Sequence, residues 1–448
     1  MSQKKKKKKT KAKPKPANKT LIPNIGKAPV LSMPAKSRGR TYAEIAAWSV
    51  LVFLLYFTYR IIVLYGADFS EFFGRFSETA PYHALDYSMG FLPRALSGQI
   101  LSFFAEPPFT KAALTAYLVT VYVIAYGLFS VIIGTMIEKA LRAKNYLMAL
   151  FPLLLIFAPT SSWYRSFWII LFDAFLLLFA LLALLAIKNE KLMWLVPITL
   201  FLGTATNYAH MLFFFPLIFA LMYYEYIKSG RRPVRLVHLI VTTISSAAME
   251  LYMVWAPFHS DQLSNYSYTD AILYIEEKAG RILEPYERWY ISVSVFGKDA
   301  AGVPISPGMH YSWLHDWWLQ PRFFLAALLI CAPIVFFSLL VWRKLAKGET
   351  GFLKKSPYFL FMLAPLIVFF EFLFFADLDR LVWGALFTQV LLMAYIFITD
   401  GQNKAFTPPA AGKKRWMIYA GFFLAIIVPA IVFMDWFVMT TPANKMSM

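Results

Sequence analysis

Cysteine and charged residues are both scarce in this sequence. Its single cysteine, Cys331, lies in an apolar run, which excludes a disulfide framework and a cysteine-based metal site. Charged residues make up 15% and hydrophobic residues 59% of the 448 residues, whereas soluble domains have roughly 25% and roughly 45–50%. A soluble protein needs more polar surface than this, so the composition indicates a membrane protein.

Metal-ligand spacing and internal repeats are also missing from the sequence. His259, His310 and His315 do not follow the spacing of a zinc site. No segment of the chain repeats another, which disfavours the transporters that are built from inverted repeats.

Long apolar runs predict the fold. A hydrocarbon core about 30 Å thick needs roughly 20 apolar residues per helix. We therefore predict an all-α, polytopic transmembrane helical bundle of about eleven spans. The predicted spans lie near residues 45–65, 112–135, 146–163, 167–187, 192–207, 211–227, 236–255, 323–342, 358–375, 381–399 and 416–437. The first exceeds the roughly 7–15 apolar residues of a signal peptide, so we expect it to remain as an anchor.

A polybasic segment precedes the first span. The formal net charge is +19, and much of it lies before Tyr42, beginning with Lys4–Lys9. Residues 1–43 are rich in Lys and Pro and poor in apolar residues, which predicts a disordered cytoplasmic tail. We expect this tail to contact anionic lipids, at about 1 kcal/mol per basic residue. RNA or ribosome binding is the alternative, but no aromatic residue is interleaved with the lysines, so we expect no nucleic-acid partner.

Loop charges predict the orientation of the spans. With the N-terminus inside, all five inner loops are basic, whereas the outer loops carry far fewer Lys and Arg for their length and many acidic residues, as the positive-inside rule requires. This frame places the transmembrane domain at 44–438 and a short tail, 439–448, outside. The outer loops 66–110 and 257–320 are long enough to fold. Residues 91–104 predict an amphipathic helix on the outer leaflet, and the aromatic second loop suits an interfacial plug or a sugar-stacking surface.

Ionisable residues inside spans are costly and usually face a cavity. Four of them lie at a similar depth in the outer half of separate spans, and His210 lies at the tip of a hairpin between two others. These four are Arg60, Asp173, Glu250 and Glu371. We predict one water-accessible cavity open to the outside; the alternative is that each is a lone structural residue.

Two motifs carry charged groups at the predicted outer surface. The sequence DLDR at 377–380 could hold a divalent cation or position a phosphate, or could be a solvated turn with an internal ion pair. No other cofactor is indicated. In DYSMGFLPRAL at 86–96, the Arg94 guanidinium could grip a lipid phosphate through a bidentate fork; the alternative is a snorkelling arginine.

The layout resembles the GT-C glycosyltransferase superfamily, in which a first span precedes a long outer loop with an interfacial helix and an early carboxylate. That resemblance implies a polyprenyl-phosphate-linked sugar substrate on the outer face of the membrane. Here Asp68 is followed by Phe69 and Ser70 instead of a second carboxylate. The chain is also similar to bacterial multispan proteins of unassigned function. Their shared elements correspond here to Gly90–Arg94, Asp173, His210 and Asp377–Arg380, with Met211 where an acidic residue is expected.

We therefore hypothesise a glycosyltransferase or polysaccharide polymerase in a bacterial cytoplasmic membrane. The predicted catalytic residues are Asp68, Asp173 and His210, with Asp68 or Asp173 as base toward an acceptor hydroxyl. The predicted substrate-binding residues are Arg94, Asp86, Arg165, Glu250, Glu371, Arg380 and Trp383. The predicted metal ligands are Asp377 and Asp379.

Two other classes of function stay open. A transporter or lipid-carrier flippase would distribute its buried charges toward both faces, whereas the four counted above lie in the outer half alone. A non-catalytic assembly subunit is the third possibility.

Overall fold

The apolar stretches of the chain fold as helices. The computed structural model describes residues 38–65, 80–152, 172–305, 321–370 and 378–400, and it describes the backbone alone for 38, 59–65, 80, 321–331, 333, 368–370 and 378–383. Within these ranges every regular element is helical and only isolated bridges occur. The prediction of an all-α chain is therefore confirmed for the described residues. Most of the predicted tail, 1–43, lies outside them.

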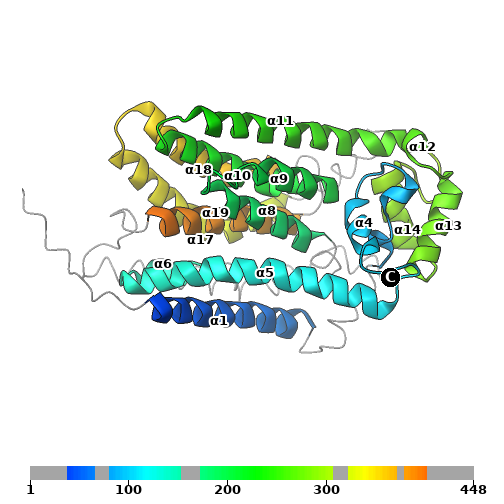
Figure 1. The fold of residues 1–448 in the computed structure, drawn as a ribbon, viewed down its shortest axis with the longest axis horizontal. Coiled ribbons are helices and arrows are strands. Elements are labelled where there is room, and N and C mark those ends of the chain that lie inside the picture. Colours follow the sequence, from blue (N-terminus) through cyan, green and yellow to red (C-terminus); the bar gives the residue numbers. More distant parts are fainter. Residues whose placement is uncertain (1–37, 66–79, 153–171, 306–320, 371–377, 401–448) are drawn as a thin grey trace, which may run out of the picture. The chain divides into compact units, whose positions relative to one another are not determined.

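The described helices comprise a bundle and a set of further elements (Figure 1). The bundle helices, called the long helices below, are α1 (Arg38–Tyr65), α5 (Lys111–Arg142), α8 (Asp173–Ile187), α9 (Leu195–Thr206), α10 (Ala209–Lys228), α11 (Pro233–Trp255), α17 (Pro321–Gly348), α18 (Phe352–Phe370) and α19 (Leu378–Asp400). The further elements are α3 (Ala80–His83), η1 (Tyr87–Met89), α4 (Leu96–Ser102), α6 (Tyr146–Leu150), η4 (Ala256–His259), α12 (Ser260–Leu263), α13 (Tyr268–Ala279), α14 (Pro285–Ile291) and η5 (Ser292–Phe296).

Four described helical stretches are long and apolar enough to cross a membrane. They are Gly39–Thr58, Lys111–Arg142, Ala209–Lys228 and Pro233–Leu263. Each of the first ten predicted spans overlaps a described helix, and the eleventh, at 416–437, lies outside the described residues. The chain is thus a helical protein with membrane-spanning helices, while the number of eleven spans and their orientation stay predictions.

Helix α11 has an exposed apolar face that is compatible with a lipid bilayer. Its buried face carries polar side chains, among them Arg235, Thr242 and Ser246. Large apolar side chains are exposed on the opposite face: Val237, Ile240, Val241, Ile244, Leu251 and Val254. A helix in a soluble protein has the reverse pattern, and an apolar patch of this extent would be unfavourable in water. The exposed face is therefore compatible with contact to a lipid bilayer.

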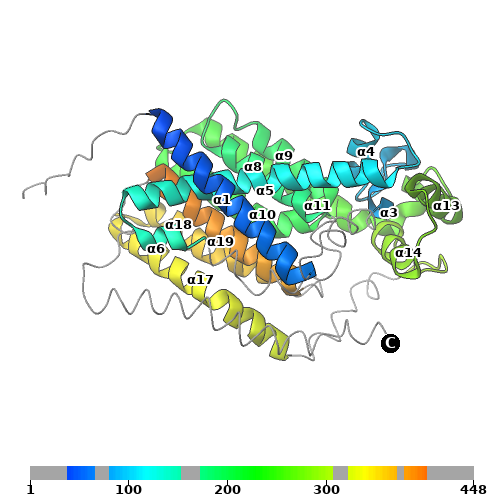
Figure 2. The same cartoon turned by 90° about the horizontal axis from the view of Figure 1, so that it is seen from below.

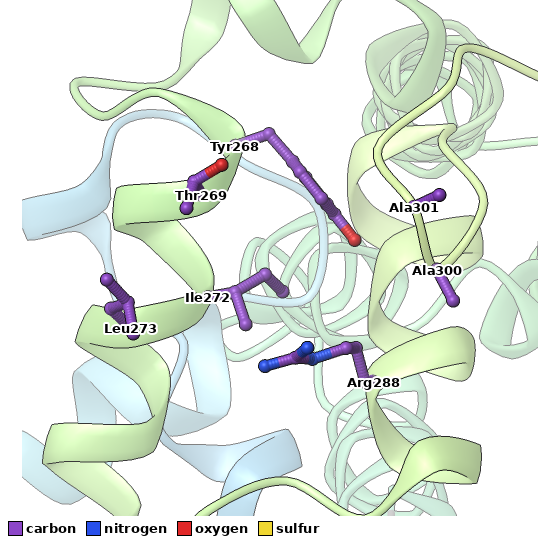
Figure 3. Close-up of a pocket in the computed structure, with 7 residues that line it drawn as sticks. All are labelled: Tyr268, Thr269, Ile272, Leu273, Arg288, Ala300 and Ala301. Carbon is purple, nitrogen blue, oxygen red and sulfur yellow. The ribbon is translucent and has the colours of Figure 1, made fainter.

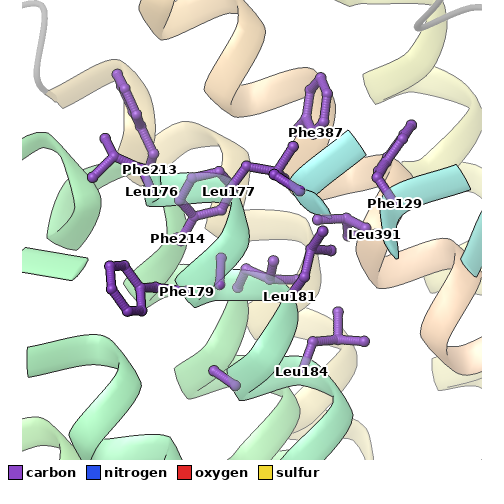
Figure 4. Packing of buried hydrophobic residues seen from close by; sticks show 14 of the residues in the cluster. Phe129, Leu176, Leu177, Phe179, Leu181, Leu184, Phe213, Phe214, Phe387 and Leu391 are labelled. Carbon is purple, nitrogen blue, oxygen red and sulfur yellow. The ribbon is translucent and has the colours of Figure 1, made fainter. Parts of the chain in front are cut away.

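The core forms where α5, α8, α10 and α19 meet (Figure 4). These four helices contact one another, and their apolar side chains interdigitate. Phe129 of α5 and Phe387 of α19 pack with ring centroids 4.9 Å apart, and Leu177 and Phe214 are fully buried beside them. Close packing of this kind drives helix association in a membrane, where neighbouring lipid is as apolar as leucine.

Hydrogen bonds between helices fix the position of α19. The indole Nε1 of Trp342 donates to Gln389 Oε1 at 3.0 Å. Gln389 Nε2 in turn donates to the Phe361 carbonyl at 3.0 Å, and Thr388 Oγ1 donates to the Phe213 carbonyl at 3.0 Å. All the side chains in these bonds are buried. Polar side chains of α19 thus form hydrogen bonds with backbone and side-chain groups of α10, α17 and α18.

Residues 81–105 and 256–305 fold together into a small helical unit, called the cap below. It contacts the end of the bundle where α5 begins and α11 ends (Figures 1 and 2). Its two segments join through contacts between α3 and α13 and through the bridge between Gly90 and Ser264. The expectation that two long loops fold is met for these residues, and we call the neighbouring ends of the long helices the cap end.

The amphipathic helix predicted at 91–104 is much shorter in the structure. Helix α4 begins only at Leu96. Arg94 has a positive φ of 66°, which the interior of a right-handed helix does not tolerate, and Pro93 lacks the backbone donor that a helix needs. The exposed side chains of Phe103 and Phe104 follow directly after α4.

The basic loops gather at the other end of the long helices, called the basic end. Three polar contacts link the helix ends there: Lys139–Ile398, Lys228–Asp400 and Arg235–Glu190. Helices α9 and α10 are joined at the cap end by Asn207 and Tyr208 alone and contact each other. Of the two arrangements that the sequence left open, a tight hairpin and one broken pair, the structure has the hairpin.

Gly203 provides a test of the hairpin packing. A Cβ at this position would lie 2.5 Å from the His210 ring, whereas a Cβ at Gly127 of α5 would meet nothing within 4 Å. Overpacking costs about 1–3 kcal/mol, so we expect Gly203→Ala to lower the thermal unfolding midpoint in lipid nanodiscs. Gly127→Ala should leave it unchanged or raise it, because alanine favours helices.

A second substitution identifies the clash as the cause. Adding His210→Ala to Gly203→Ala should recover part of the lost stability. Equal thermal unfolding midpoints for Gly203→Ala and Gly127→Ala would contradict this packing.

Candidate functional site

Residues Gly90–Arg94 are held against the second segment of the cap, residues 256–305. Gly90 has φ 110°, and a Cβ there would lie 2.0 Å from the Leu263 carbonyl oxygen. Only glycine allows this conformation and this approach together. Asn265 completes the contact, because its backbone N–H donates to the Met89 carbonyl at 2.8 Å. The turn that follows places Arg94 between the cap and the bundle.

Arg94 is a buried cation without a carboxylate partner. Only 3% of the residue is exposed, and it forms no ion pair within the described part of the chain. Its Nη1 donates to the Tyr290 hydroxyl at 2.5 Å, and its Cζ lies 5.1 Å from the ring centroids of Tyr208 and Tyr290. Its Nε has no hydrogen-bond partner. Snorkelling, the alternative weighed from the sequence, does not fit a side chain buried to this degree.

Glu250 is a carboxyl at the cap end of α11 that forms no ion pair among the described residues. It lies in the last two turns of α11 beside Met249, which packs in one cluster with Tyr208 and Tyr252. Its Oε2 is buried without a hydrogen-bond partner. Among the described residues, neither Glu250 nor Arg94 forms an ion pair. Each has unused hydrogen-bonding capacity for a ligand.

Asp173 and His210 lie around the first turns of α8. Asp173 is buried in the first turn, where the helix dipole favours a negative charge. The His210 ring is fully buried; it has a weak interaction with the Leu176 backbone, and otherwise neither ring nitrogen has a partner. From the cap, the His83 ring packs 5.3 Å from the ring of Phe172, the residue before Asp173.

Four predicted site residues therefore lie at the cap end: Arg94, Asp173, His210 and Glu250. The sequence argument did not find the aromatic neighbours Tyr208 and Tyr290, because nothing in a linear pattern relates them to Arg94. It also missed His83, whose contacts come from α4 and α8.

Asp86 lies near Arg94 but is fully engaged within the cap. Its carboxylate forms a buried ion pair with Lys278 and accepts hydrogen bonds from the Ser88 backbone at 3.0 Å and from the Ser102 hydroxyl at 3.1 Å. Burial disfavours the charged carboxylate, but the hydrogen bonds from Lys278 and Ser88 outweigh it and lower the pKa of Asp86. This arrangement holds the cap together; a role in substrate binding stays a prediction.

Lys278 could have been recognised from its spacing. The buried residues of α13 include Ile272, Ile275 and Ala279, and Lys278 lies three residues after Ile275, on the same helix face. A basic residue on an apolar face predicts a buried acidic partner.

Several predicted site residues cannot be placed. Asp68, Arg165, Glu371 and Asp377 lie outside the described residues. Asp379, Arg380 and Trp383 belong to the first turns of α19, of which the backbone alone is described. The metal site proposed at Asp377 and Asp379 and the role of Arg60 stay predictions for the same reason.

Buried charges are not confined to the cap end, which corrects the sequence argument. At the basic end, Glu225 and Arg235 lie 3.6 Å apart, with side chains 11% and 7% exposed. The Tyr395 hydroxyl donates to Glu225 at 3.0 Å, and Arg235 also pairs with Glu190. Glu225 falls inside a predicted span, but its partner Arg235 comes from the next helix. That pairing is visible only in three dimensions.

A pocket lies within the cap, and Arg94 is not among the residues that line it (Figure 3). It has a volume of about 180 Å³ between α13, α14 and the loop that follows η5. The side chains of Tyr268, Ile272, Arg288 and Ala300 line it.

Comparisons with protein-family models, curated proteins and solved structures found no match for this chain. The site geometry therefore supplies the functional argument.

The buried ion pair of the cap leads to a stability prediction. Asp86→Asn leaves a charged Lys278 buried without its partner, which costs about 3 kcal/mol and should lower the thermal unfolding midpoint. The double variant Asp86→Asn, Lys278→Met should recover most of the loss. In the control Asp261→Asn, the carboxylate is 70% exposed and the effect should stay below about 1 kcal/mol. Equal effects at Asp86 and Asp261 would be inconsistent with a buried pair.

His83 leads to a prediction about acid stability. Burial lowers the pKa of His83 from 6.5 to about 3, so below pH 6.5 the unfolded chain binds a proton that the folded chain does not. Stability should fall with decreasing pH by up to about 1.4 kcal/mol per unit. His83→Gln does not titrate, so its unfolding midpoint should fall less between pH 6.5 and 4. Parallel curves for the two proteins would refute this assignment.

Proposed function

We propose that the protein is a membrane enzyme that transfers or polymerises sugars from a polyprenyl-phosphate carrier at the cap end of its helices. The observation that carries this proposal is the buried Arg94 guanidinium, which has no carboxylate partner among the described residues. Burying a charge without compensation is costly. A protein that retains such a cation is therefore prepared for an anionic ligand.

A phosphate is the anion that suits this site. A guanidinium binds phosphate oxygens through a planar, bidentate fork, and Arg94 has an unused Nε donor for it. Tyr208 and Tyr290 flank the guanidinium and restrict its orientation. Tyr208 lies between two helices of the bundle and Tyr290 lies in the cap. A lipid phosphate would therefore bind between the cap and the bundle, with its hydrocarbon chain beside the apolar helices.

The neighbouring carboxyl groups suit the rest of the reaction. An acceptor hydroxyl attacks the anomeric carbon, the bond from that carbon to the phosphate oxygen breaks, and the phosphate leaves with the electron pair. A carboxylate takes the proton of the hydroxyl. Asp173 and Glu250 are the candidates among the described residues, and Arg94 stabilises the charge of the leaving phosphate. We place this reaction on the outer face of a bacterial cytoplasmic membrane, following the loop charges.

One observation favours a transporter or lipid-carrier flippase as the second candidate. The buried pair of Glu225 and Arg235 lies at the basic end, so buried charges occur toward both faces. These charges compensate one another, however, whereas Arg94 is uncompensated. A flippase would move labelled polyprenyl phosphate between the leaflets of a vesicle without any sugar acceptor.

The decisive variant is Arg94→Gln. Loss of a charged hydrogen-bonding group costs about 1.5–3 kcal/mol of binding, so undecaprenyl phosphate should bind about tenfold to hundredfold more weakly. Binding is measured on the purified full chain in nanodiscs. The thermal midpoint without ligand should stay equal or rise, because an uncompensated buried charge is removed.

Two controls separate binding from folding. Arg232 lies at the basic end with 61% of its side chain exposed, so Arg232→Gln should leave lipid binding unchanged. Arg94→Lys retains the charge without the fork and should bind with intermediate strength. A fall in stability of Arg94→Gln with unchanged lipid binding would show a structural role and overturn the proposal.

A further inference from the structure

Arg288, which lines the pocket in the cap, has a hydrogen-bond donor that the protein does not use. The Arg288 side chain extends from α14 toward α13 along one side of the pocket (Figure 3). Its Nη2 donates to Glu276 Oε1 at 3.0 Å, but its Nε is buried without a partner. A buried N–H without an acceptor costs about 1–3 kcal/mol. An acceptor atom of a ligand in the pocket would satisfy it.

The charge of Arg288 is already compensated. Glu276 has a side chain 12% exposed and forms an ion pair with the guanidinium. The nearby cation Lys298 is likewise paired, with Asp261. A second anion would therefore gain little in this pocket, unlike at Arg94. The ligand that fits is neutral and carries hydroxyl groups.

The opposite side of the pocket is apolar and held in place. Tyr268 and Ile272 of α13 provide it. The Tyr268 hydroxyl forms a hydrogen bond with Ser292 Oγ at 2.5 Å, and its contact with the Asp299 carbonyl oxygen is 3.2 Å long. The ring position is therefore fixed before any ligand binds. A fixed aromatic ring facing polar groups suits a sugar, which has apolar C–H faces and hydroxyl edges.

The size of the pocket limits the ligand to one ring. Its volume is about 180 Å³, smaller than the roughly 300–1,000 Å³ of sites that hold drug-sized molecules. Exposed Ala300 lies at its edge, where a larger side chain would narrow the entrance.

We propose that this pocket binds one ring of a neutral sugar. The binding follows from the pocket alone. Its assignment to the glycan of the transfer reaction rests on the proposed function, with the lipid phosphate at Arg94 and a sugar of the glycan in the cap.

Saturation-transfer NMR on the full chain tests this site. Lipid nanodiscs are required, because a maltoside detergent would itself offer a sugar. The probes are glucose, galactose, N-acetylglucosamine and glucuronate. We expect transfer to at least one neutral sugar, loss of that signal in Ala300→Trp, and affinity about threefold to tenfold weaker in Arg288→Ala, the effect of losing one hydrogen bond.

Ile282→Trp is the matched control, since this cap residue is 78% exposed and does not line the pocket. It should retain the signal. Transfer to none of the sugars, transfer to glucuronate alone, or a signal that persists in Ala300→Trp would each overturn the proposal.

The two proposals fail separately. Sugar binding that Ala300→Trp abolishes, together with unchanged lipid binding in Arg94→Gln, would retain the sugar site and reject the transferase. A sugar signal that persists in Ala300→Trp, together with weaker lipid binding in Arg94→Gln, would retain the phosphate site and reject the pocket.

Discussion

The buried ion pair between Asp86 and Lys278 is the contact on which the cap depends. It links two segments that are 192 residues apart in the chain, and no described helix continues from one into the other. Gly90 brings the same segments together by allowing direct backbone contact with Leu263. Arg94 meets Tyr290 only because these contacts hold the first segment against the second.

The arginines of the structure differ in how their charge is balanced. Arg235 pairs with two carboxylates at the basic end, and Arg288 pairs with Glu276 in the cap. Arg94 has tyrosines around it and no acidic partner among the described residues. Because the cost of a buried charge depends on its compensation, the first two have structural explanations and Arg94 calls for a ligand.

Part of the candidate site was predictable from the chain itself. Asp173, Glu250 and Arg94 stand out because a charged group in or beside an apolar run is rarely tolerated without a reason. Their neighbours were not predictable. Tyr208 and Tyr290 are ordinary aromatic residues of a chain with 25 tyrosines. Glu225 is visible inside a predicted span and was wrongly left out of the count, but its pairing with Arg235 of the next helix was not predictable.

The sequence by itself determined that the chain is helical and membrane-embedded, because span length and loop charge act locally and need no tertiary contact. It also identified which charged residues would be costly to bury. Only the tertiary structure decided which of those charges are compensated, since Asp86 finds Lys278 and Arg94 finds no carboxylate among the described residues. Electrostatic balance depends on distances of a few ångströms between segments far apart in the chain.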